Sequence, residues 1–338
     1  MKRLTIAILN WNGAEMLKRF LPSVLAYSQI PDVEICVIDN ASTDGSCDVL
    51  ANDFPDVRII RLAENYGFSE GYNRGLQQVD AEYVLLLNSD VEVTEGWLLP
   101  LLQYMDANPE IAACQPKIRS QRNKEYFEYA GASGGFIDCY GYPFCRGRIF
   151  DTVEKDEGQY DDIVPVFWAT GAALMVRQAI YNKVGGLDAR FFAHMEEIDF
   201  CWRLRSRGYG IVCIPQSQVY HVGAATLRKE NPRKTYLNFR NNLLMLYKNL
   251  SEKELKRVMR IRFFLDYTAS LVFLLKGDFS NACAVWRARR DYRKMRKSYL
   301  AHRQNNLKNT TVASIRERVS FSLLWRSKFK GRVRYSDL

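Results

Sequence analysis

The chain has 338 residues, of which 47% are hydrophobic and 25% are charged, which is ordinary for a globular protein and excludes a disordered or low-complexity chain. Its net charge of +10 is unevenly placed: residues 1–250 carry 26 basic and 31 acidic side chains, whereas residues 251–338 carry 22 and 7. The length suits one large domain with an extension, or two domains, and the positive charge belongs to the C-terminal part.

The N-terminus and the cysteines point to a cytoplasmic protein. Met1-Lys2-Arg3 runs directly into an apolar strand without a cleavage site, so no signal peptide is expected. The eight cysteines include no Cys-x-x-Cys pair, and Cys36 and Cys213 lie inside apolar runs. We therefore expect buried, reduced thiols.

Strand and helix signals alternate through the first part of the chain. Strands are expected at 4–9, 33–38, 57–62 and 83–87, and helices at 14–27, 46–52 and from a glycine-rich turn at 65–75 to about 79. This alternation predicts an α/β fold with a mostly parallel sheet and right-handed crossovers.

The middle of the chain is less regular. Residues 115–165 are rich in glycine and aromatic residues and are expected to form loops and short strands over one face. Order returns with an apolar run at 166–176, a helix at 178–184, a helix that begins near Glu196 and ends at Gly208, and a strand at 211–214.

The chain beyond Leu250 is expected to be helical and basic. Residues 261–275 are mostly apolar, but the run is interrupted by Arg262 and Asp266 and is shorter than the roughly 20 apolar residues of a membrane span. The segment predicts either a non-spanning attachment to an anionic membrane surface or a helical extension packed on the rest of the protein.

Two aspartates follow apolar strand-like runs, Asp39 after 33–38 and Asp90 after 83–87. Ligands of parallel α/β sheets bind at the carboxyl ends of the strands. A carboxylate there can hold a nucleotide base or ribose, or a cation that bridges a diphosphate. The pattern predicts a nucleotide diphosphate held through a metal, with Glu92 as a second metal candidate; taken alone, each segment also fits a capped turn.

Other polar positions have two interpretations each. The helix start at Glu196-Glu197-Ile198-Asp199 fits favourable helix-dipole chemistry or a general base. His221 fits a structural role or a ligand role. Gly67, Gly71 and Gly75 are spaced by three residues, unlike the Gly-x-Gly-x-x-Gly dinucleotide fingerprint, which argues against a Rossmann dehydrogenase.

Together these segments resemble one family. Residues 6–13, 37–46, 65–68 and 87–90 are similar to the N-terminal half of a family 2 glycosyltransferase. Thr170-Gly171-Ala172, Gly185-Gly186-Leu187-Asp188 and residues 196–199, followed by His221, are similar to its acceptor half. The resemblance spans about residues 4–250, and the chain looks most like the rhamnosyltransferase-like branch.

The resemblance implies a GT-A fold and an inverting, metal-dependent transfer of a sugar from a nucleotide-sugar donor, UDP- or dTDP-linked and possibly dTDP-rhamnose. The acceptor would be a hydroxyl of a glycan or polyprenyl-linked saccharide in cell-surface polysaccharide synthesis. Residues 1–250 would form the catalytic domain, divided near 115 into nucleotide-binding and acceptor halves. Residues 251–338 would be a basic helical region.

The resemblance also assigns residue roles. Glu197 would be the catalytic base, with Glu196 and Asp199 as alternatives. Asp90 and His221 would hold a divalent metal, Mg²⁺ or Mn²⁺, and Asn88 stands where the family's Asp-x-Asp motif has its first aspartate. The donor-binding residues would be Asn10, Asp39, Asn40, Ser42, Asp44, Asn65, Gly67, Asn73, Asn88 and Asp90.

Two other functions fit part of the pattern. A nucleotidyltransferase also places carboxylates on a metal, but it usually has a basic, glycine-rich loop after the first strand, where this chain has residues 10–15, which lack one. A nucleic-acid-binding protein could use the basic tail, but the tail interleaves charge with aliphatic more than with stacking aromatic side chains. We therefore expect no nucleic acid partner and a peripheral protein on the cytoplasmic face of the membrane.

Overall fold

The computed structural model describes residues 1–223 and 231–338. Its helices are α1 (Ala14–Tyr27), α2 (Ser46–Asp53), α3 (Gly67–Leu76), α4 (Leu98–Ala107), α5 (Gln178–Val184), α6 (Glu196–Ser206), α7 (Pro232–Asn249), α8 (Glu252–Leu275), α9 (Phe279–Met295) and α10 (Leu300–Lys308). Short 3-10 or π turns cover Ala189–Phe191, Trp325–Phe329 and Tyr335–Asp337.

The strands form two sheets. The large sheet contains β1 (Lys2–Asn10), β2 (Val33–Asp39), β3 (Arg58–Arg61), β4 (Ala81–Asn88), β5 (Val91–Val93), β6 (Ile111–Ser120), β11 (Val164–Pro165), β12 (Ala173–Arg177) and β13 (Gly210–His221). Its order is β11-β13-β6-β12-β4-β1-β2-β3, and β5 pairs with β13. A small sheet contains β7 (Gly135–Ile137), β8 (Pro143–Cys145), β9 (Arg148–Ile149) and β10 (Thr152–Val153).

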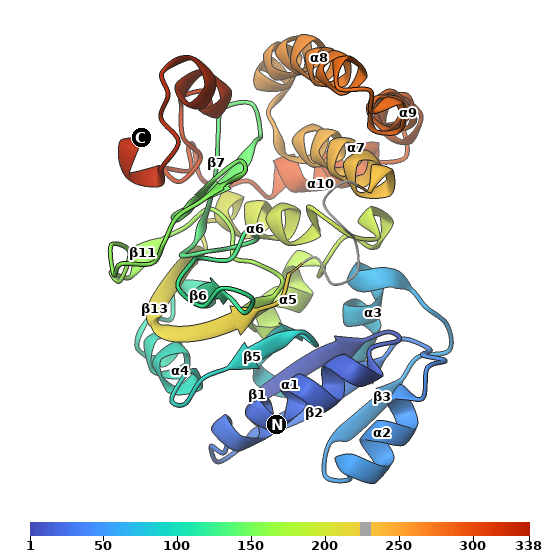
Figure 1. Ribbon diagram of the computed structural model, residues 1–338, viewed down its shortest axis with the longest axis vertical. Coiled ribbons are helices and arrows are strands. Elements are labelled where there is room, and N and C mark those ends of the chain that lie inside the picture. The colour runs from blue at the N-terminus through green and yellow to red at the C-terminus, as the bar shows by residue number, and fades with distance from the viewer. Residues whose placement is uncertain (224–230) are drawn as a thin grey trace.

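The predicted strand–helix alternation is confirmed over residues 2–88. Strands β1, β2, β3 and β4 pair in parallel, and Asn10 lies opposite Asp39 in the β1–β2 register. Strand β4 is apolar on both faces because its alternate side chains enter two hydrophobic clusters, Val84 and Leu86 in one and Tyr83, Leu85 and Leu87 in the other. The loops after β1, β2 and β4 therefore emerge at one edge of the sheet, where the site lies (Figure 1).

Beyond β4 the sheet is mixed rather than parallel. Strand β12 runs antiparallel to both β4 and β6, and only residues 173–176 of the apolar run at 166–176 are part of it. Strand β13 is longer than the predicted 211–214, since it continues to His221 and pairs with β6 and β5. This extension carries His221 to the same edge as Asp90.

The loops and short strands expected over 115–165 include β7, β8, β9 and β10, but β6 is a longer strand that runs through residue 115. Gln115, Pro116 and Lys117 resemble a turn, but they lie in the interior of the large sheet. Gln115 accepts a hydrogen bond from the Thr170 backbone N–H at 2.9 Å, and Lys117 donates to Asp156 at 3.2 Å. Buried polar groups are tolerated here because each has a hydrogen-bond partner. The neighbouring sequence does not show these partners.

The four C-terminal helices form a layer at one end of the molecule (Figure 1). Helix α7 packs against α9 and α10, and α8 packs against α9. Arg303 of α10 donates to the Leu250 carbonyl at 2.6 Å, so contacts cross the predicted domain boundary near Leu250. The boundary itself stays a prediction, and the helical layer begins earlier, with α7.

The last thirty or so residues return to the small sheet. The Val319 N–H donates to the Ile137 carbonyl, the Leu323 N–H to Asp138 and the Tyr335 N–H to Glu154, each at 2.9 Å. In the described ranges, 1–223 and 231–338, no helix combines the length and apolarity needed to cross a bilayer.

Candidate active site

The loop after β2 is built around Asp39. The Asn10 amide donates to Asp39 Oδ1 at 3.2 Å and to Ser42 Oγ at 3.1 Å, and the Ser42 N–H donates to Asp39 Oδ2 at 3.1 Å. Asp44 accepts from the Ala14 N–H at 2.9 Å, which fixes the start of α1 to the same loop. A carboxylate offers about four acceptor sites, so Asp39 keeps capacity for a ligand while its orientation is set.

Asn40 ties this loop to the glycine-rich turn that precedes α3. Its amide donates to Asn65 Oδ1 and to the Gly67 carbonyl, both at 3.0 Å, and its oxygen accepts from the Tyr66 N–H at 3.0 Å. Gly67 has a φ of +76°, and a Cβ atom there would lie 2.7 Å from the Phe192 ring. Glycine is therefore required by both conformation and space.

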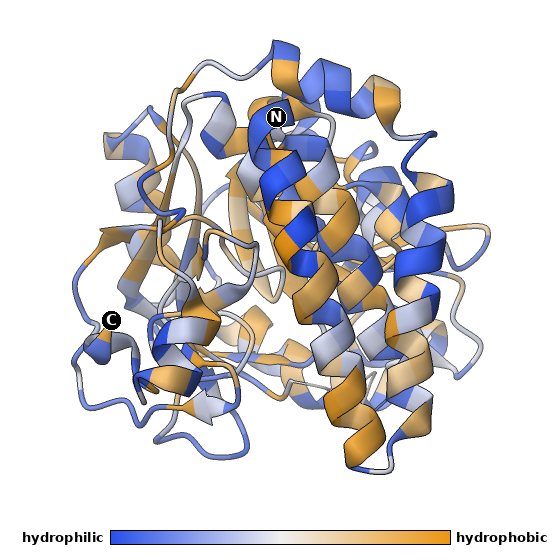
Figure 2. Cartoon of the chain, turned by 90° about the horizontal axis from the view of Figure 1, so that it is seen from above, coloured by the Kyte–Doolittle hydropathy of each residue, from blue (hydrophilic) through white to orange (hydrophobic). Residues whose placement is uncertain are grey.

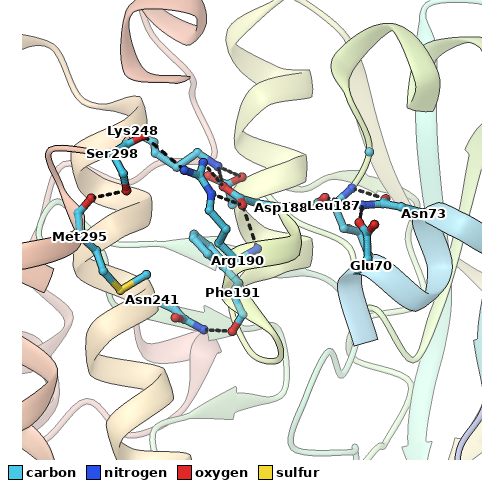
Figure 3. Close-up of polar contacts among 12 residues, drawn as sticks. Glu70, Asn73, Leu187, Asp188, Arg190, Phe191, Asn241, Lys248, Met295 and Ser298 are labelled. Carbon is cyan, nitrogen blue, oxygen red and sulfur yellow. Dashed lines mark hydrogen bonds and ion pairs between the residues drawn. The ribbon is translucent and has the colours of Figure 1, made fainter. Parts of the chain in front are cut away.

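Asn73 lies away from this edge. Its amide donates to the Leu187 carbonyl at 2.8 Å, and its oxygen accepts from the Leu187 N–H at 3.0 Å and from the Tyr181 hydroxyl at 2.7 Å (Figure 3). These contacts join α3 to the turn at 185–188. A nucleotide contact by Asn73 stays a prediction that this geometry does not favour.

Asp90 and His221 meet at the end of the sheet. The β5–β13 pairing places His221 opposite Val91, and the Asp90 Oδ1 and His221 Nε2 atoms are 3.1 Å apart. The Asn88 amide nitrogen is 3.4 Å from the same ring nitrogen. Both members of the Asp90–His221 pair are buried.

The opposite charges dominate the pKa values of this pair. Burial alone would raise the pKa of Asp90, but the hydrogen bond and charge of His221 outweigh it and lower that pKa. Burial would lower the pKa of His221, but Glu128 and Asp90 raise it to about 10. The carboxylates thus favour a charged imidazole when no cation is present.

Glu128 is a site residue that the sequence did not reveal. Its Oε2 atom lies 3.6 Å from His221 Nδ1, the ring nitrogen that faces away from Asp90. Gly223, at a φ of +63°, leaves room for this carboxylate, since a Cβ atom there would lie 2.5 Å from Glu128 Oε1. Histidines that ligate metals are typically oriented by a carboxylate at their second nitrogen, but no motif around residue 128 signals this role.

The donor atoms at this edge fit a divalent cation that is shared with a diphosphate. Across residues 1–223 and 231–338, no three His, Cys, Asp or Glu side chains converge on one metal position. Asp90 offers a carboxylate oxygen and His221 an imidazole nitrogen, which suit Mn²⁺ or Mg²⁺ when phosphate oxygens and water complete the coordination. Glu92 does not join them, because it pairs with Lys124 at 2.7 Å.

The acidic start of α6 contains two neighbouring carboxyl groups, Glu196 and Glu197, each with one buried oxygen. Glu196 Oε2 and Glu197 Oε2 are both buried, and neither has a hydrogen-bond partner among the described residues, 1–223 and 231–338. Burial raises the pKa of Glu197 to about 7, and burial together with the charge of Glu197 raises the pKa of Glu196 well above its usual value. A carboxyl group with a pKa near neutrality is suited to general base catalysis.

Glu197 is the better placed of the two for catalysis. It keeps partial exposure, whereas Glu196 is buried. A Cβ atom on Gly171 would lie 3.8 Å from Glu197 Cβ, and the neighbouring Ala172 carbonyl accepts from the Asn88 N–H at 3.0 Å. The segment 170–172 therefore connects Glu197 to the end of β4.

Asp199 lies in a different environment from Glu197. It is fully buried and pairs with Arg203 at 3.0 Å and Lys248 at 2.7 Å, and it accepts from Asn249 at 2.9 Å. Both of its oxygens are engaged by cations or amides, so it is a structural anion and not an available base. This geometry does not favour Asp199 as the alternative base, and that role stays a prediction.

The turn at 185–188 belongs to the same structural network. Lys248 of α7 contacts Asp188 at 2.6 Å, and Arg190 contacts it at 3.3 Å (Figure 3). Burial would raise the pKa of Asp188, but the charges of Lys248 and Arg190 hold it well below its usual range. The motif anchors α7 behind the site.

Arg146 and Arg148, two basic side chains in the glycine-rich middle, face inward. Arg146 pairs with Asp162, and buried Arg148 donates to the Tyr129 carbonyl at 2.9 Å. Both guanidinium groups therefore already have partners in this part of the chain.

Comparisons with known proteins agree with this arrangement. A family model described as glycosyl transferase family 2 matches residues 5–181. The chain is 29% identical over 233 residues to N-acetylglucosaminyl-diphospho-decaprenol L-rhamnosyltransferase of Mycobacterium tuberculosis, covering 64% of this chain and 75% of that protein. It is 26% identical over 250 residues to the low-salt glycan biosynthesis hexosyltransferase Agl10 of Haloferax volcanii, covering 71% and 74%.

Solved structures show the same fold. The structure of GalNAc-T7 with UDP, GalNAc and Mn²⁺ has a TM-score of 0.62 at 15% identity, covering 89% of this chain and 57% of that one. The mannosyltransferase PcManGT of Pyrobaculum calidifontis with GDP-Man and Mn²⁺ has a TM-score of 0.52 at 14% identity, covering 92% and 89%. The predicted GT-A-like α/β fold is confirmed, and the nucleotidyltransferase alternative is set aside. The chain belongs to family 2 of the glycosyltransferases.

Proposed function

We propose that the protein is an inverting, metal-dependent glycosyltransferase that moves a sugar from a nucleotide-diphosphate sugar to a hydroxyl of a glycan or polyprenyl-linked saccharide. The observation that carries the proposal is the position of Glu197, a carboxyl group with an unused oxygen, connected through residues 170–172 to the strand end that bears Asp90. A base and a diphosphate site on connected segments suit attack and departure on opposite faces of the sugar.

Each residue of the site has its own proposed role in the reaction. Asp39, oriented by Asn10 and Ser42, would hold the nucleoside, and Asp90 with His221 would hold the metal. When bound, the cation would supply charge neutralisation and Lewis acidity to the departing diphosphate. Glu197 would take the proton of the acceptor hydroxyl, whose oxygen attacks the anomeric carbon from the face opposite the diphosphate, so the configuration inverts. Positioning of both substrates would supply much of the remaining acceleration.

Rhamnose is the proposed donor sugar, because the relative from Mycobacterium tuberculosis is named a rhamnosyltransferase. The test is a thermal-shift screen of UDP-, GDP- and dTDP-sugars with Mn²⁺ or Mg²⁺. A ligand that binds only the folded state raises its stability by about 2.7 kcal/mol at a hundred times its Kd. We expect dTDP-rhamnose to raise Tm most, and only with the metal. No shift with any nucleotide sugar would contradict the proposal.

We also propose that the protein works at the cytoplasmic face of a membrane in cell-surface polysaccharide synthesis. An apolar patch covers the adjoining ends of α8 and α9, and Figure 2 shows it as the orange end of these two helices. Leu275 is 79% exposed and Phe279 66% exposed, and the patch also includes Leu271, Val272 and Leu274. Lys276 is exposed directly after the patch, and the exposed Lys256 and Arg260 lie further back along α8.

This combination favours a bilayer over nucleic acid as the partner. Apolar side chains that are exposed together gain free energy by entering lipid, and each nearby Lys or Arg contributes about 1 kcal/mol at an anionic surface. Two such signals are sufficient for attachment without a span. A nucleic acid would contact the charges but would leave the aliphatic side chains in water.

Replacing Leu274, Leu275 and Phe279 with Ser is expected to abolish flotation of the full chain with liposomes that contain anionic lipid. All three side chains are exposed, so the fold should survive. The matched control is Leu99→Ser, an exposed leucine on α4, which should float like the wild type. Equal flotation of the triple variant, or none by the wild type, would contradict membrane attachment.

A further inference from the structure

A cavity of about 400 Å³ lies between α7 and α9 and is lined by Arg233, Tyr236, Arg287, Arg290 and Asp291. Its lining carries three guanidinium groups and one carboxylate, so its net charge is positive. The carboxylate is already engaged, since Asp291 accepts from the Tyr236 hydroxyl at 2.9 Å and from Arg290 at 3.0 Å. The cavity therefore favours an anion.

The other two arginines have unused donors. Arg233 lies over the Phe192 ring at 5.2 Å and Arg287 over the Tyr236 ring at 5.8 Å. Both are exposed, and among residues 1–223 and 231–338 neither makes an ion pair with a carboxylate. A guanidinium held by a ring face keeps its N–H groups for an oxyanion, and its planar fork matches phosphate oxygens.

The cavity is adjacent to the catalytic side of the molecule. Phe192, beneath Arg233, packs against Gly67 of the donor-side turn. Asn241 of α7 donates to the Phe191 carbonyl at 3.0 Å and holds the loop that leads into Glu196 and Glu197 (Figure 3).

The same cavity is connected to the apolar patch through α9. This helix begins at Phe279 in the patch, and Arg287 is eight residues further along, about 12 Å at 1.5 Å per residue. The arginines thus lie between the proposed membrane surface and the loop that carries the base.

We propose that this cavity binds the phosphate group of a lipid-linked acceptor, while the lipid chain stays in the bilayer and the attached saccharide reaches Glu197. The inference rests on the proposed function, because it names the class of acceptor for that site. The chemistry that the arginines recognise is a phosphate ester or diphosphate. A polyprenyl diphosphate and a bilayer phospholipid both offer it, and the test separates them.

The test measures binding of farnesyl diphosphate to the full chain by calorimetry. Farnesol, which lacks the diphosphate, inorganic pyrophosphate, which lacks the chain, and a short-chain phosphatidylglycerol serve as comparison probes. We expect farnesyl diphosphate to bind most tightly. The double variant Arg233→Ala/Arg287→Ala should weaken that binding by about tenfold or more for each arginine removed.

The matched control is Arg293→Ala/Lys294→Ala, which removes two exposed cations of α9 that do not line the cavity. It should bind farnesyl diphosphate like the wild type. Equal weakening in both double variants, or equal binding of farnesol, would overturn the proposal. Equal binding of phosphatidylglycerol would overturn the acceptor assignment.

A donor measurement separates this inference from the proposed function. The Arg233→Ala/Arg287→Ala variant should keep the thermal shift produced by the nucleotide sugar and metal, because its substitutions lie outside the donor residues. If the variant loses binding of farnesyl diphosphate but keeps the thermal shift produced by the nucleotide sugar, the result supports the cavity as the phosphate site. Absence of a donor shift in the wild type contradicts the proposed function and leaves the cavity measurement intact.

Discussion

Replacing Glu197 with Gln is expected to lower the rate of sugar transfer by about 10²–10⁴-fold while leaving donor binding unchanged. The amide has the size of the carboxyl group but cannot take the proton from the hydroxyl of the acceptor substrate. The measurement is transfer to a saccharide acceptor, with nucleoside diphosphate affinity measured in parallel. Asp199→Asn is a poor comparison because it breaks a buried ion pair; Glu196→Gln is the matched variant, and it should keep transfer.

The pH profile distinguishes a base from a merely structural carboxyl group. Burial raises the pKa of Glu197 to about 7, and a base must be ionised to act. The rate of the wild-type protein should therefore rise with pH and level off above about 7. A flat profile, or a Gln variant that transfers sugar at the wild-type rate, would assign the base to another residue.

The raised pKa of Glu197 also affects the stability of the fold. Stability should fall as pH rises, whereas the transfer rate should increase. The usual pKa of glutamate, 4.5, lies below the folded value of about 7, so the unfolded state loses this proton first as pH rises. The contribution of Glu197 to stability therefore falls between these two values and stays low above them. Glu197→Gln should raise Tm relative to the wild type at about pH 8 and lose that advantage below about pH 4.5.

Much of the fold could be predicted where the hydrophobic pattern of a segment matches its burial in the folded protein. Residues 83–87 of β4 are apolar because both faces of the strand are packed in the core, and the polar residues at its end mark where the chain leaves the core. Strand β6 was missed because the partners of Gln115 and Lys117 include residues far along the chain, Thr170 and Asp156. A central strand with buried polar residues cannot be separated from a turn by periodicity alone.

Some residues of the candidate site could likewise be predicted from the sequence, and others could not. The positions of Asp39 and Asp90 at the ends of strands could be predicted because strand ends are local features of the sequence. Glu128 was missed because its role depends on a contact with His221, 93 residues later, and on the space left by Gly223. Spacing at the start of one helix does not distinguish Asp199 from Glu197. The contacts of Asp199 with Arg203, and with Lys248 and Asn249 of α7, make it a structural anion.

Replacing Asp90 with Asn is expected to weaken the metal-dependent binding of a nucleoside diphosphate by about 100-fold, measured by calorimetry with Mn²⁺. Loss of residues that only orient a ligand costs about 10–100-fold in metal affinity, so loss of a direct charged ligand should reach at least the upper value. The wild-type protein in EDTA should show the same weak affinity, because the diphosphate then lacks its neutralising ion. Glu128→Gln should give a smaller loss, since Glu128 contacts only the far nitrogen of His221.

Glu92→Gln is the matched control for Asp90→Asn. It removes one carboxylate charge two residues away, but Glu92 pairs with Lys124 and accepts from Gln121 at 3.3 Å instead of facing His221. If loss of general negative charge at this edge governed binding, both variants would change affinity alike. A loss confined to Asp90→Asn assigns the effect to coordination. Wild-type affinity that is undiminished in EDTA would remove the metal from the mechanism.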